Sequence, residues 1–272
     1  MKHIYFLIFI TPATILFLFE LYFIKPKTFY AVLILTNLLI FFTIKLFKIH
    51  LVKMSDSHPL VLKIISPFIE KTNKNWKNFL ILPMCFATSI AIYSTLMTNK
   101  FFTQFLFLLN FLLIYSYIKN TYYYLIHPKF YKNEKFENIV LYGNFLTFFF
   151  TSSIIYGLQS FIHAPIWMLM IIITPIIFLM TYNILWINEI NNKENFIFIL
   201  INYLILAEIT WSLSFFPLNY HIRALILSIC YYVLVNLLKL YLKNILTYKT
   251  IKLYLISGCA GIILILLTAQ WL

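Results

Sequence analysis

Apolar runs of membrane-spanning length recur along almost the whole chain and leave little room for any other fold. A helix that crosses the hydrocarbon core of a bilayer needs about 20 mainly apolar residues, and nine segments approach that length. Only 11% of the residues are charged, against about 25% in a typical soluble domain. The sequence therefore predicts an all-α, polytopic transmembrane helix bundle of about nine spans.

The nine predicted spans fill the chain and leave only short loops, so residues 1–272 are expected to form a single integral membrane domain. Each span should be a helix, because lipid offers the backbone no other open-ended way to satisfy its hydrogen bonds. The predicted spans cover residues 4–24, 29–44, 79–98, 101–118, 139–161, 164–186, 196–216, 221–241 and 252–270.

The positions of the basic residues predict how the chain is threaded. Nine spans place all but four of the 21 Lys and Arg residues on the side of the N-terminus. The four on the other side are Lys25, Lys27, Lys100 and Arg223. Loops rich in lysine stay in the cytoplasm, so the N-terminus is predicted inside and the C-terminus outside, in a membrane that the chain crosses many times.

One loop, between the second and third spans, is long enough for structure of its own. Its apolar residues Leu60, Ile64 and Phe68 recur at helical spacing, with Lys63 and Lys74 between and beyond them. This pattern predicts an amphipathic helix near residues 58–72. We expect it to lie in the headgroup layer, where lysines meet anionic lipid.

The net charge of +13 does not indicate a nucleic-acid partner, because the lysines lie in short loops between apolar runs. The expected partners are the lipid bilayer and other membrane proteins. Cys85, Cys230 and Cys259 each fall in a different run and form no closely spaced ligand pair. The sequence predicts neither a metal site nor a cofactor.

Ionisable side chains within spans are costly and mark candidate sites. Glu208 lies about 12 Å below the outer end of the seventh span, and Arg223, the only arginine, begins the eighth. One hypothesis is an ion pair that clamps this hairpin. The other is an outward-facing site with Glu208 as proton carrier or base and Arg223 as anion anchor. Four further polar residues are expected in the same outer half: Glu20, Gln159, His163 and His221.

Two stretches in the second half of the chain carry a distinctive set of mainly aromatic and apolar residues. The first stretch, 137–186, carries Asn144, the aromatic run 148–150, Tyr156, Gly157, Leu158, Gln159, Phe161, Pro165, Trp167, Leu185 and Trp186. The second carries Glu208, Trp211, Leu213, Ser214, Phe215, Phe216 and Pro217, then Tyr231, Tyr232, Leu237, Tyr241 and the closing Thr268, Ala269, Gln270 and Trp271. Together these stretches resemble uncharacterised multispan membrane proteins of candidate-phylum, patescibacteria-like bacteria. The resemblance implies a bacterial cytoplasmic membrane, which the chain would cross many times, and assigns no catalytic residue.

Three functions stay open at this point. The absence of catalytic motifs and the small loops favour a non-enzymatic membrane component or scaffold. Glu208 and Arg223 are residues that a transporter or channel uses, although four glycines in 272 residues leave few places for broken helices. An intramembrane enzyme acting on lipid-linked substrates would normally need several acids, histidines or a metal in a recognisable arrangement.

Overall fold

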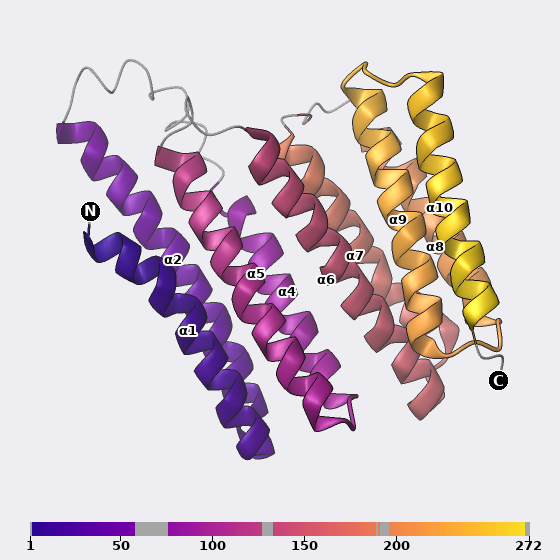
Figure 1. Ribbon diagram of the computed structural model, residues 1–272, viewed down its shortest axis with the longest axis horizontal. Helices are drawn as coiled ribbons and strands as arrows, with labels where there is room; N and C mark the ends of the chain where they lie inside the picture. The colour runs from indigo at the N-terminus through magenta and orange to yellow at the C-terminus, as the bar shows by residue number, and fades with distance from the viewer. Residues whose placement is uncertain (1, 58–75, 127–132, 189, 191–195, 270–272) are drawn as a thin grey trace. The chain divides into compact units, whose positions relative to one another are not determined.

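The computed structural model describes residues 2–57, 76–126, 133–188, 190 and 196–269, and these residues are almost entirely helical (Figure 1). Within them, nine helices are long enough and apolar enough to cross a membrane, which confirms the predicted all-α class and the number of apolar helices. Membrane crossing and its direction stay predictions. The helices are α1 (Lys2–Ile24), α2 (Phe29–Ser57), α4 (Asn78–Thr95), α5 (Lys100–Ile126), α6 (Asn133–Ile162), α7 (Ile166–Ile187), α8 (Phe196–Ser214), α9 (Tyr220–Leu242) and α10 (Tyr248–Thr268).

The helices differ from the predicted spans mainly at the lysine-rich ends. Helix α2 continues 13 residues beyond the predicted limit at 44, through Lys45 and Lys48 to Ser57. Helices α5 and α6 are likewise longer at that side. Hydropathy marks where apolar residues stop, whereas lysine is a good helix former and its long stem can stay beside apolar surface. The predicted interfacial helix near residues 58–72 lies outside the described residues.

The chain divides into two compact units, Met1–Gly143 and Asn144–Leu272. The division falls within α6, and each unit is described by itself. The single membrane domain predicted from the sequence therefore stays a prediction.

In the first unit, α1 packs against α2 and α5, and α4 packs against the same two helices. Polar side chains join these helices inside otherwise apolar contacts. The hydroxyls of Thr11 and Thr43 are 2.9 Å apart and link α1 to α2. The Gln104 amide of α5 donates to Glu20 Oε2 of α1 over 3.0 Å. Such hydrogen bonds between helices are a main source of association in lipid.

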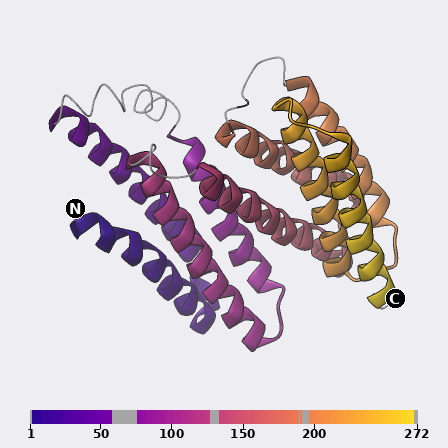
Figure 2. The ribbon, with the colours of Figure 1, turned by 45° about the horizontal axis from the view of Figure 1, so that its top comes forward.

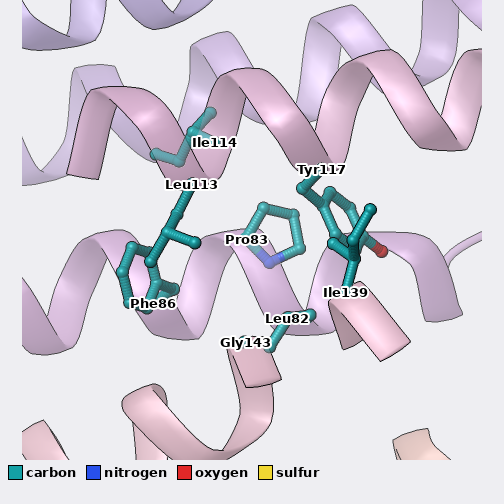
Figure 3. Close-up of a pocket in the computed structure, with 8 residues that line it drawn as sticks. All are labelled: Leu82, Pro83, Phe86, Leu113, Ile114, Tyr117, Ile139 and Gly143. Carbon is teal, nitrogen blue, oxygen red and sulfur yellow. The ribbon is translucent and has the colours of Figure 1, made fainter. Parts of the chain in front are cut away.

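Pro83 interrupts the backbone hydrogen bonds of α4, since it has no N–H to donate to the carbonyl of Phe79. The buried hydroxyl of Tyr117, on α5, donates to that same carbonyl over 2.9 Å. Beside this contact lies a small apolar pocket, drawn in Figure 3. Its lining residues are Leu82, Pro83, Phe86, Leu113, Ile114, Tyr117, Ile139 and Gly143.

In the second unit, α7 packs on α8, α8 on α9, and α9 on α10. The last two helices lie side by side in both ribbon views, orange and yellow (Figure 2). Tyr231 of α9 stacks on Phe148 of α6 with ring centroids 4.2 Å apart. Gly258 is the buried residue of α10, and a Cβ there would stand 2.8 Å from Val233 Cγ2 on α9. A larger residue at position 258 would therefore force Val233 or the helix to shift.

Candidate functional site

The connection between α8 and α9 places Arg223 at one end of the second unit. Helix α8 ends at Ser214, and α9 begins at Tyr220. Asn219 caps α9, because its side-chain oxygen accepts from the backbone N–H of His221 over 3.3 Å. Arg223 consequently lies in the first turn of α9, beside the end of α8, and is 7% exposed.

The Arg223 guanidinium joins three helices through hydrogen bonds. Its Nη1 donates to Gln159 Oε1 of α6 over 3.1 Å and to the carbonyl of Ser214 on α8 over 3.4 Å. Its Nη2 donates to Ser160 Oγ over 2.7 Å. The Gln159 amide also donates to the Ser214 carbonyl, over 3.3 Å. We call Tyr156, Gln159, Ser160, Ser214 and Arg223 the Arg223 cluster.

The charge of Arg223 is met by neutral groups. The guanidinium carbon lies 5.2 Å from the centroid of the Tyr156 ring, a cation–π contact. The Tyr156 hydroxyl donates onward to the Thr210 carbonyl of α8. Arg223 Nε is buried with no acceptor, and Arg223 forms no ion pair with any carboxylate among the described residues. The cluster therefore ties three helix ends together and keeps a net positive charge.

Glu208 lies on the exposed side of α8. It stands within a row of large apolar residues spaced three or four apart, so that all of them share one helical face. We call this row the Glu208 stripe; besides Glu208 it contains Ile197, Ile201, Leu204, Trp211 and, directly after the last residue of α8, Phe215. The opposite face of α8 is buried and carries Asn202 and Thr210. The expected clamp between Glu208 and Arg223 is not formed, because Glu208 faces outward while Arg223 bonds to α6 and to the end of α8.

The remaining candidate residues separate into different surroundings. Gln159 lies beside Arg223, as described above. Glu20 belongs to the first unit and accepts from Gln104. His163 is exposed in the α6–α7 connection with a φ of 53°. His221 is half-buried and lies against the ring of Tyr220, with centroids 3.8 Å apart.

Sequence reasoning missed Tyr156, Ser160 and Ser214 as members of the Arg223 cluster. Residue counting gives the depth of a side chain in a span, but it does not give the direction in which the side chain leaves the helix. One signal was available. Asn202 and Thr210 are eight residues apart, so they share a face that excludes Glu208, and small polar residues mark helix-packing faces in lipid.

The chemistry that these groups offer is hydrogen bonding and attraction of anions by Arg223. Within the described ranges, no group of three or more His, Cys, Asp or Glu side chains is placed to hold a metal ion.

A family model described as "Protein of unknown function (DUF5656)" matches residues 21–268. The match covers most of the chain, so the chain belongs to this family. The comparisons with curated proteins and with solved structures found no match.

Proposed function

We propose that this member of the DUF5656 family is a non-enzymatic component of a bacterial cytoplasmic membrane, a scaffold that packs against other membrane proteins. The observation that carries this proposal is the Arg223 cluster. Arg223, on α9, is bonded to α6 and α8 through neutral hydrogen-bond acceptors. Such a group holds helix ends in place, which is a structural role.

The surface of the second unit supports an interaction role. Only 6% of the spanning part of α10 is buried, against 61% of α4. Helix α10 packs along α9 and presents large apolar residues such as Leu253, Ile256 and Leu264 on its other sides. A scaffold needs faces of this kind, since helices associate in lipid by close packing of side chains.

Native mass spectrometry of the protein, extracted gently from its own membrane, tests the proposal. We expect protein partners in fixed stoichiometry with the chain. Extraction of the chain alone, in a detergent that keeps other membrane complexes intact, contradicts the scaffold function.

The proposed topology places the N-terminus in the cytoplasm and the C-terminus outside. The asymmetric placement of lysines along the nine apolar helices supports it. A reporter that works only outside the cytoplasm should therefore be active when it is fused after Leu272. If a reporter that works only in the cytoplasm is active at this position instead, the predicted topology is inverted or the chain has one span fewer.

A second candidate function is the capture of an anionic group at the Arg223 cluster, as a transporter or an enzyme for lipid-linked substrates would require. The lack of a carboxylate partner for Arg223 among the described residues favours it, since an arginine fork fits phosphate and carboxylate oxygens. A phosphate-bearing lipid that stays bound after extraction, and is lost from Arg223→Gln, would support this function. Equal lipid retention by both proteins would exclude it.

A further inference from the structure

The Glu208 stripe combines a continuous apolar surface with a single acidic group. Trp211 and Phe215 are 54% and 65% exposed, and Ile197, at the other end of the stripe, is 64% exposed. Glu208 stands near the middle of this face, about 9 Å from the end of α8 at Ser214. In a bilayer spanned by α8, that distance would place the carboxyl group beyond the interface, in the apolar region.

An acidic side chain in this position has two possible surroundings within a membrane. Facing lipid tails, a carboxylate has no hydrogen-bond donor, and this costs free energy. Facing another helix, it can meet a cationic side chain, and the pair then adds specificity to apolar packing. The stripe therefore has the composition of an interface: large apolar residues surround one charge that needs a complementary charge.

The described part of the chain does not supply that complementary charge. Among the described residues of the second unit, Arg223 is the only cationic one near this depth, and it is buried and bonded to Gln159, Ser160 and Ser214. The described lysines lie toward helix ends, as Lys100 does at the start of α5. A second copy of the chain offers the same groups, so charge complementarity points to a different protein.

We propose that the Glu208 stripe is the docking surface for a membrane-spanning helix of another protein, and that this helix carries a lysine or arginine at the depth of Glu208. The inference rests on the scaffold function proposed above and names the surface and the chemistry of its partner. Leu204 and Trp211, one turn to either side of Glu208, would contact the same helix.

Photo-cross-linking in intact membranes of the cells that naturally make the protein tests the proposal. A photoreactive phenylalanine analogue replaces Leu204 or Trp211 in the full-length chain. Phe17 on α1, which is 66% exposed, serves as a control position that is at least as exposed as the two test positions. After irradiation, the adduct is purified through a tag on the chain, and mass spectrometry identifies the cross-linked peptide.

We expect Leu204 and Trp211 to cross-link to one membrane protein, at a span with Lys or Arg within one turn of the linked residue. Glu208→Leu should lower the adduct yield by about tenfold or more, because it removes one partner of a charge pair. Glu208→Gln, which keeps the size and hydrogen-bonding capacity of the side chain, should lower it less. Adducts at Phe17 should not respond to either change.

Four results would overturn the proposal: an adduct of twice the chain's mass, cross-links only within the chain or to lipid, a partner span without a basic residue, or a yield unaffected by Glu208→Leu. If the same partners co-purify equally well with the unchanged protein and with Glu208→Leu, the scaffold function stands and only the docking role of the Glu208 stripe is refuted. Absence of any partner in native mass spectrometry would refute both.

Discussion

Glu20 and Glu208 both lie well inside apolar helices of this protein, and their surroundings are opposite. Glu20 of α1 is half-buried and accepts a hydrogen bond from Gln104 of the neighbouring helix α5. Glu208 of α8 is exposed among apolar side chains. At Glu20, the cost of placing an acid in an apolar helix is offset by an internal hydrogen bond. The contrast suggests that Glu20 serves the fold and that Glu208 serves an interaction outside the chain.

Arg223 makes more hydrogen bonds inside the protein than Glu20 does, so its replacement should lower the stability of the fold the most. Arg223→Leu loses the hydrogen bonds to Gln159, Ser160 and Ser214. We expect the free energy of unfolding in detergent to fall by about 2–4 kcal/mol, measured by thermal unfolding. Arg223→Lys, which keeps the charge but not the fork geometry, should lose less. An unchanged stability for Arg223→Leu would remove the cluster from the structural account.

Gly258 tests whether close packing rather than polar bonding holds the last helix. A Cβ at Gly258 would stand 2.8 Å from Val233 Cγ2, whereas a Cβ at Gly261 would stand 3.7 Å from Ile229 Cδ1. Gly258→Ala should destabilise the protein by about 1–3 kcal/mol through overpacking, and Gly261→Ala is the matched control with little effect. Equal effects of the two alanines would show that α10 does not approach α9 at Gly258.

Glu20 and Gln104 should show a smaller, mutual dependence. Glu20→Leu and Gln104→Leu each remove one half of a hydrogen bond of 3.0 Å, and we expect each to lower the free energy of unfolding by about 1–2 kcal/mol. The double substitution should cost less than the sum of the two. A double-mutant cycle in detergent measures the coupling, and strictly additive costs would mean that the two side chains do not interact.

The sequence predicted the helices far better than the contacts between them. The number of apolar helices and most of their ends follow from hydropathy, because the length of a span is set by the thickness of a bilayer. The extension of α2 past Lys45 was missed, since lysine ends an apolar run without ending a helix. Residue counting also gave the positions of Glu208 and Arg223 along their helices.

The partners of these two residues could not be predicted in the same way. Arg223 meets Gln159 and Ser160, more than 60 residues earlier in the chain, and such long-range neighbours depend on how each helix is rotated about its axis. Six residues separate Asn202 from Glu208, which turns their side chains to different sides of α8. The rotation of a helix about its axis decides whether an acidic side chain faces the inside of the protein or its surface. Hydropathy alone does not predict this rotation.

The most direct test of this account compares Glu20→Leu with Glu208→Leu by thermal unfolding in the same detergent. Glu208→Leu should leave the free energy of unfolding unchanged or raise it slightly, since leucine suits an exposed face of a membrane helix better than glutamate, whereas Glu20→Leu should lower it. A loss of stability from Glu208→Leu as large as that from Glu20→Leu would contradict the account, because it would make Glu208 part of the internal structure of the chain.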